Sequence, residues 1–169
     1  MNRTRALIVG LAVPTLLAGT ALAVSPATGS QGARSAVGSW QMSIDPRPIQ
    51  TPNGPTDPPA FPSMVALNRG GTLTESASTL PGPAVSILGA DGATAGIGAW
   101  KQHGSVLTFA FKKFLTKGGA LVGWQLVAGT GRSTSTSTTQ TATATFYNAA
   151  GTQVGPVLTV DATGTRLTP

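Results

Sequence analysis

Few side chains in this chain can perform acid–base or nucleophilic chemistry, and they are scattered. The 169 residues include five acidic residues, one histidine and no cysteine. His103 precedes Gly104 in a predicted tight turn, which argues against a Ser–His–acid arrangement, and a lone histidine cannot build a multi-histidine metal site. The lack of cysteine removes disulfides and thiolate metal ligands. The sequence therefore predicts no metal site and no cofactor.

Two residues remain as catalytic candidates, Glu75 and Tyr147. Glu75 shares one face of a predicted strand with Leu73 and Ala77, and that face can point into an apolar interior. A buried carboxylate is costly unless it is paired, so an inward Glu75 would indicate contact with a ligand or a substrate. A shift of one residue would place Glu75 in solvent instead, and both placements stay open.

The elements that must position these residues are strands. From Gly38 onward, short runs alternate apolar and polar residues, and no window has the periodicity of a helix. Threonine, valine and aromatic residues are frequent in these runs, and all favour strands. Turns rich in glycine separate several of them. Eight strands are predicted, over residues 38–45, 62–68, 72–78, 94–102, 105–115, 120–128, 137–148 and 152–167.

Eight strands joined mostly by short turns favour an antiparallel meander. Closure into a barrel removes the two unpaired edges of an open sheet and leaves room for side chains or one small ligand. The sequence thus predicts an all-β fold, an eight-stranded antiparallel up-and-down barrel, with a two-sheet sandwich as the competitor. The two longest connections, 46–61 and 79–93, fall at one end of such a barrel. We expect the proline-rich 46–61 to be a lid over that end, with a tolerated surface insertion as the alternative.

Strand alternation predicts which side chains line the barrel interior. Phe109 and Phe111 share a face, Phe114 is expected to continue it toward the mouth, and Ala142 and Ala144 leave space beside the rings. The alternative is that the apolar side chains simply fill a solid core. The predicted pocket residues are Met42, Met64, Glu75, Phe109, Phe111, Phe114, Trp124, Ala142, Ala144 and Tyr147.

Three lysines near the same end, Lys112, Lys113 and Lys117, are expected to form a basic rim. Such a rim is either solvated surface or a contact for an anionic group of a ligand. The Gly96-x-Gly98 pair is no nucleotide fingerprint, because no helix is predicted to follow it, and it is expected to permit curvature of the barrel.

Trp40 and Arg166 are predicted to form a barrel-closing structural pair. Closure brings the first and last strands together, so that the Arg166 guanidinium can lie on the Trp40 ring as a cation–π contact. The Gly38-x-Trp40 segment and Arg166 resemble the Gly-x-Trp and terminal-arginine features of lipocalins and the wider calycin superfamily. The pattern "GSWQMSI…FPSMVALNRGGTLTES…GIGAWKQHGSVLTFAF" also resembles small secreted lipocalin-like barrel proteins of bacteria. This resemblance implies a cup that binds a small molecule, and an allene-oxide-cyclase-like barrel fits the strand count equally well.

The N-terminus resembles a secretory signal. Arg3 and Arg5 precede the largely apolar residues 6–23, whose small-residue end predicts cleavage by signal peptidase after Ala23. An uncleaved membrane anchor is the less favoured alternative. We therefore expect a secreted, extracellular protein exported by the Sec route. The predicted organisation is a signal peptide over 1–23, a flexible spacer over 24–37 and the β-barrel domain over 38–169.

Composition narrows the partners. Charged residues make up only 9% of the chain, too few for the many phosphate contacts of a nucleic-acid binder. Three tryptophans, one tyrosine and five phenylalanines cannot build the two aromatic girdles of a membrane barrel, so no stable membrane insertion is expected. The sequence leaves the oligomeric state open.

Three functions fit these observations. The first is a secreted carrier or sensor that binds a small apolar or amphipathic molecule, and an anionic group on that molecule would fit the basic rim. The second is a barrel enzyme of the isomerase or cyclase type, with Glu75 and Tyr147 as its candidates. The third is a solid-core protein whose surface binds a partner. The residues favour the first and leave catalysis as the less favoured alternative.

Overall fold

The computed structural model describes residues 35–51 and 53–168. The predicted signal peptide, its cleavage after Ala23 and most of the predicted spacer lie outside these residues. The last spacer residues belong to the folded part, since Ala36 is fully buried and its backbone N–H donates to Gln102 Oε1 at 2.7 Å.

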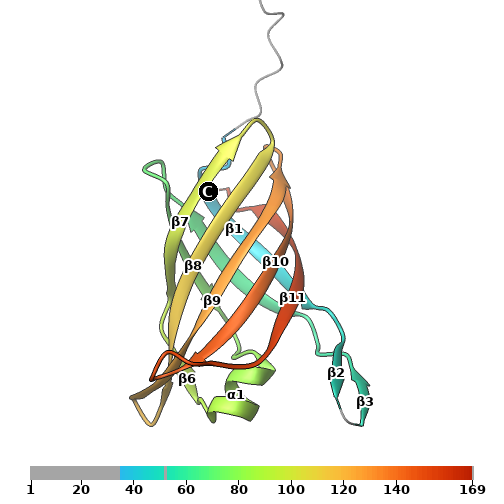
Figure 1. Cartoon of the computed structure of the whole chain (residues 1–169). Coiled ribbons are helices and arrows are strands. Elements are labelled where there is room, and N and C mark those ends of the chain that lie inside the picture. Colours follow the sequence, from blue (N-terminus) through green and yellow to red (C-terminus); the bar gives the residue numbers. More distant parts are fainter. Residues whose placement is uncertain (1–34, 52, 169) are drawn as a thin grey trace, which may run out of the picture. The chain divides into compact units, whose positions relative to one another are not determined.

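Eight long strands form one closed antiparallel sheet (Figure 1). Each of these strands pairs with the next one along the chain, and β11 pairs with β1 to close the barrel. The predicted up-and-down barrel is thereby confirmed over the sandwich. The strands are β1 (Gly38–Pro46), β4 (Phe61–Leu67), β5 (Thr72–Ala77), β7 (Gly96–His103), β8 (Val106–Lys117), β9 (Ala120–Ser133), β10 (Ser137–Asn148) and β11 (Gln153–Arg166).

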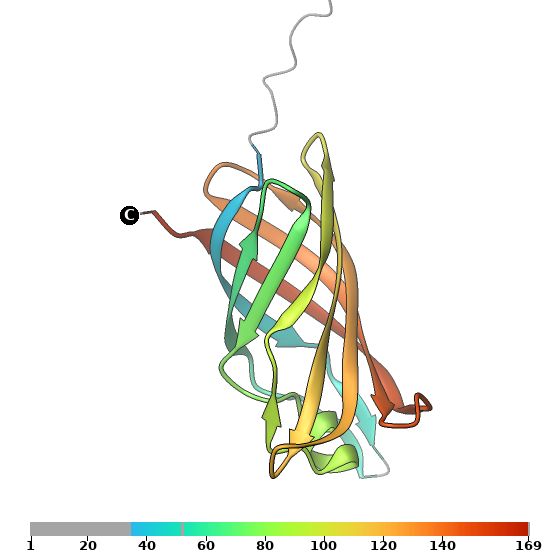
Figure 2. The same cartoon turned by 90° about the vertical axis from the view of Figure 1, so that its left-hand side faces the viewer.

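The two long connections carry short elements of their own. The first holds a hairpin of β2 (Ile49–Thr51) and β3 (Gly54–Thr56), and the second holds α1 (Gly82–Leu88) followed by β6 (Gly92–Ala93). Both views place these elements at the same end of the barrel, as the sequence predicts (Figures 1 and 2). We call this the capped end and the opposite one the floor.

Helix α1 covers part of the capped end, and the sequence analysis missed it. The helix has a proline in its first turn and ends at Gly89, whose φ of 61° is left-handed, the arrangement typical of short helices. Ala84 is fully buried, and Leu88 is half-buried against the core. The predicted lid over 46–61 is therefore corrected: α1 lies across the barrel end, while the β2–β3 hairpin projects beside it (Figure 1).

An exposed ion pair fixes the start of the 46–61 connection to the barrel wall. Arg47 Nε lies 2.7 Å from Asp161 Oδ2 on β11, and Thr141 Oγ1 donates to Asp161 Oδ1 at 2.7 Å. The hydrogen bonds from Arg47 and from Thr141 hold the pKa of the Asp161 carboxyl below its ordinary value. The connection is thus anchored at its base.

The floor is closed by Trp40 and Arg166, which are register partners on β1 and β11. The Trp40 side chain is 1% exposed, and the Arg166 guanidinium carbon lies 4.5 Å from its ring centroid. Gly38 permits this approach, because a Cβ there would lie 2.5 Å from Arg166 Nη1. The structure thus brings the two residues of the predicted barrel-closing pair into contact.

Candidate functional site

The barrel encloses a cavity of about 80 Å³. Apolar side chains from seven of the eight long strands line most of it, and Pro81, just before α1, lines it from the capped end. The cavity is much smaller than the ~300 Å³ at which drug-sized pockets begin. The apolar lining residues are Met42, Ile44, Pro46, Phe61, Val65, Leu67, Leu73, Pro81, Leu107, Phe109, Phe111, Val127, Ala142, Ala144, Leu158, Val160 and Ala162.

Six of the ten predicted pocket residues face this cavity. The rings of Phe109 and Phe111 are stacked, with their centroids 6.4 Å apart, and the alanines of β10, two strands further along the barrel, line the same cavity. The six residues are Met42, Glu75, Phe109, Phe111, Ala142 and Ala144.

The other four predicted pocket residues lie outside the lumen. Met64 is 48% exposed and Phe114 is 47% exposed, since their neighbours Ser63 and Lys113 take the inward positions of β4 and β8. Phe114 does not continue the face of Phe109 and Phe111, because it lies three positions after Phe111 and an odd step reverses the face of a strand.

Trp124 and Tyr147 form a separate cluster on the outer face of the barrel. Their rings stack with centroids 5.6 Å apart, and Lys112 Nζ lies 4.7 Å from the centroid of Trp124. The inward positions beside them belong to Gln125 and Phe146, which are both buried. Neither Trp124 nor Tyr147 lines the cavity, so Tyr147 does not join Glu75 in one site.

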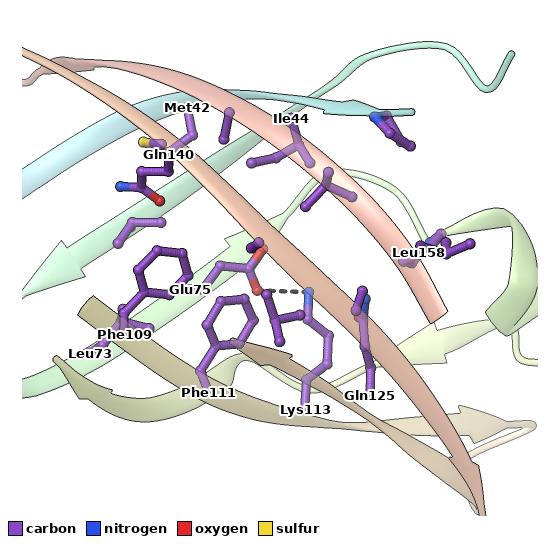
Figure 3. Close-up of a pocket in the computed structure, with 18 of the residues that line it drawn as sticks. Met42, Ile44, Leu73, Glu75, Phe109, Phe111, Lys113, Gln125, Gln140 and Leu158 are labelled. Carbon is purple, nitrogen blue, oxygen red and sulfur yellow. Dashed lines mark ion pairs between the residues drawn. The ribbon is translucent and has the colours of Figure 1, made fainter. Parts of the chain in front are cut away.

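A buried ion pair lies inside the lumen (Figure 3). Lys113 Nζ is 2.7 Å from Glu75 Oε2, and the two side chains are 7% and 6% exposed. Ser63 Oγ donates a hydrogen bond to the other carboxylate oxygen of Glu75, at 2.7 Å. The inward placement of Glu75 is therefore the correct alternative, and Lys113 is separated from the predicted rim of lysines.

Strand β7 makes this ion pair possible. Glu75 on β5 and Lys113 on β8 are separated by β7, where the inward position beside Glu75 is Gly96. A Cβ at Gly96 would lie 2.6 Å from Phe111 Cδ2 and 3.1 Å from Glu75 Oε2. Gly96 thus provides the space in which the carboxylate meets the lysine beside the Phe111 ring.

Two glutamines complete the polar part of the cavity wall. Gln125 is 5% exposed, and its Oε1 has no hydrogen-bond partner among residues 35–51 and 53–168. Gln140 differs, because its Nε2 donates to Thr138 Oγ1 at 3.3 Å. Strand parity counted from Phe111 finds Lys113, but nothing in the sequence indicates that the Gln125 amide lacks a partner.

The Glu75 carboxylate is occupied by Lys113 and Ser63, and in the described part of the chain no three His, Cys, Asp or Glu residues are grouped to hold a metal ion. Within the same residues, no helix has the length and apolar character needed to cross a bilayer.

The fold and the site together define a class: a closed eight-stranded antiparallel barrel with an apolar lumen and a buried ion pair on its wall. Comparison of the sequence with protein-family models and with curated proteins finds no match.

Proposed function

We propose that this protein is a secreted, lipocalin-like barrel that binds one small, mainly apolar molecule in its lumen and acts as its carrier or sensor. The proposal joins the barrel with the Gly38-x-Trp40 and Arg166 features and with the signal-like N-terminus. Catalysis is less well supported, because Glu75 and Tyr147 do not share a site.

The observation that carries the proposal is a polar cluster with an unmet hydrogen bond inside an apolar cavity. Buried polar atoms in native proteins nearly always have partners, and an unmet one costs roughly 1–3 kcal/mol. Gln125 Oε1 lacks a partner in the described part of the chain, and its residue lines the cavity. A bound molecule that completes this hydrogen bond would recover that free energy.

The cavity volume sets the size of the ligand. About 80 Å³ admits a molecule of a few heavy atoms, well below the ~300 Å³ of a drug-sized site. A longer molecule requires the capped end to open. Helix α1 is suited to such a movement, because it has only seven residues and no side-chain cap at its N-terminus.

The solid-core protein with a binding surface stays as the second candidate. The small cavity favours it, and so does the outer cluster of Trp124, Tyr147 and Lys112, next to the exposed Phe114. Aromatic residues are enriched in interfaces between proteins. On this alternative, the lumen would bind nothing.

Native mass spectrometry of the protein secreted by its own host tests the proposal. We expect an added mass of one small molecule per chain, which is lost when the lumen is filled by the substitution Ala144→Leu. A bare polypeptide mass, together with no uptake of added small apolar molecules, would overturn the proposal and leave the surface-binding alternative.

A further inference from the structure

We infer that the lumen selects a neutral ligand that carries one hydrogen-bonding group, such as an alcohol, over an anionic ligand. This inference rests on the proposed function and names the chemical class of the ligand for the same cavity. It replaces the anionic group that the three neighbouring lysines suggest in the sequence.

The first observation is that the positive charge of the lumen is already neutralised. Lys113 is the only cationic residue among the described residues that line the cavity, and its ammonium lies 2.7 Å from the Glu75 carboxylate. Lys112 and Lys117 are exposed. An anion that entered the lumen would meet Glu75 as well as Lys113 and would lose its hydration without an unpaired cation to compensate.

The second observation is the unpartnered amide of Gln125. Its Oε1 is buried and unbonded in the part of the chain that the structure describes, and the residue is 5% exposed on the cavity wall. The last torsion of a glutamine side chain is broad and roughly two-fold, so a half-turn about it presents either its oxygen or its nitrogen to the cavity. A hydroxyl group both donates and accepts, and it therefore matches either orientation of the amide.

Apolar neighbours determine the rest of the ligand. Phe111 lies beside Glu75 and Lys113 (Figure 3), and Phe109, Met42, Leu158 and Val127 are among the apolar residues of the lining. These apolar side chains offer no strong hydrogen-bonding groups, and the backbone groups of the same residues are used in pairing the strands. The favoured ligand thus has an apolar body and a single neutral polar end directed at Gln125.

A buried water is the competing occupant of the same position. The cavity is large enough to hold one water molecule, and such a water would satisfy Gln125 without any ligand. A hydroxyl that displaces the water and keeps its hydrogen bond would gain affinity, whereas a purely apolar molecule would not.

Three probes of equal chain length test the inference: hexane, 1-hexanol and hexanoate, whose chains are longer than the closed cavity and enter when the capped end opens. Their affinities are measured on the folded chain by titration followed in ¹H–¹⁵N NMR spectra at neutral pH. Gln125→Met removes the unpartnered amide at similar volume. Gln140→Met is the matched control, since Gln140 lies on the same lumen but its amide is already bonded to Thr138.

We expect Gln125→Met to lower the ratio of 1-hexanol to hexane affinity by about tenfold, the change that loss of one buried hydrogen bond produces. Gln140→Met should leave this ratio unchanged within about twofold, and hexanoate should bind at least about tenfold more weakly than 1-hexanol because its charge must be desolvated.

Two results would overturn the inference while leaving the proposed function intact. One is a 1-hexanol to hexane ratio that Gln125→Met does not change, as a retained water would give. The other is hexanoate binding in the lumen as tightly as 1-hexanol. If neither these two probes nor 1-propanol, which is short enough for the closed cavity, shifts any lumen signal, the inference and the proposed function both fail.

Discussion

Arg166 covers the Trp40 ring from the last strand of the barrel and also ties three backbone carbonyls together. Its guanidinium donates to Ser135 O at 2.6 Å, to Ser35 O at 2.8 Å and to Val37 O, and its carbon lies 4.5 Å from the ring centroid. One side chain therefore joins β1, β11, the segment before β1 and the turn between β9 and β10. These contacts hold together the floor of the barrel, which lies at the opposite end from the capped end.

Arg166→Ala should lower the free energy of unfolding by about 2 kcal/mol, because it removes charge-assisted hydrogen bonds as well as the cation–π contact. Urea denaturation measures this loss. Arg132→Ala is the control: Arg132 is exposed and its side chain donates to Ser105 Oγ at 3.2 Å, so a change below about 0.5 kcal/mol is expected. Equal losses in both variants would contradict a special role for Arg166.

The ion pair of Glu75 and Lys113 should behave as a coupled unit. Glu75→Leu or Lys113→Met alone leaves one buried charge unpaired and should lower stability by about 3–5 kcal/mol, whereas the double variant should lie close to the wild type or above it. A double-mutant cycle from chemical denaturation gives the coupling free energy. Additive losses would mean that the two charges reach solvent separately.

Gly96→Ala should disturb the site directly. Its new Cβ would meet the Phe111 ring and the Glu75 carboxylate, and overpacking of this kind costs about 1–3 kcal/mol. We also expect weaker binding of 1-hexanol, because Phe111 has to move within the lumen. Gly70→Ala is the matched control, since among the described residues no atom other than those of its chain neighbours lies within 4 Å of its Cβ position, and it should leave binding unchanged.

Helix α1 should control access to the lumen. Replacement of residues 82–88 by a Gly–Ser linker of equal length should speed both association and dissociation of 1-hexanol by about tenfold, which corresponds to ~1.4 kcal/mol off the barrier. The same replacement of the hairpin residues 49–56 should leave both rates nearly unchanged. Stopped-flow or NMR exchange experiments measure these rates in both variants. A larger change in the rates on replacing the hairpin than on replacing α1 would mean that 46–61 is the lid.

Strand periodicity was enough to predict the eight strands, their order and the two ends of the barrel. It also placed Trp40 on Arg166, since closure alone makes the first and last strands neighbours. The direction of each side chain was predicted less well than the strands themselves. A wrong assignment of parity after Phe111 placed Phe114 in the lumen and Lys113 on the rim. Such errors arise because the residue type does not show whether an aromatic side chain of a strand points into or out of a barrel. Only its parity relative to residues of known direction does.

Other features depend on contacts that no local pattern contains. The seven residues of α1 are too few to show a helical period, although Pro83 and Gly89 at its ends are a usable signal. The ion pair spans β5 and β8 across Gly96, and it follows only from the register of three strands. The unmet bond of Gln125 depends on every side chain around it.

The most direct test of the central claim is an NMR titration of the folded chain with 1-hexanol, compared with the same titration of Ala144→Leu. Ala144 is 2% exposed and lines the cavity, so a leucine there fills the lumen. A lumen that binds small molecules predicts saturable shifts at Phe109, Gln125 and Ala144 in the wild type and none at lumen positions in the variant. No shift in the wild type, or identical shifts in both proteins, would contradict it.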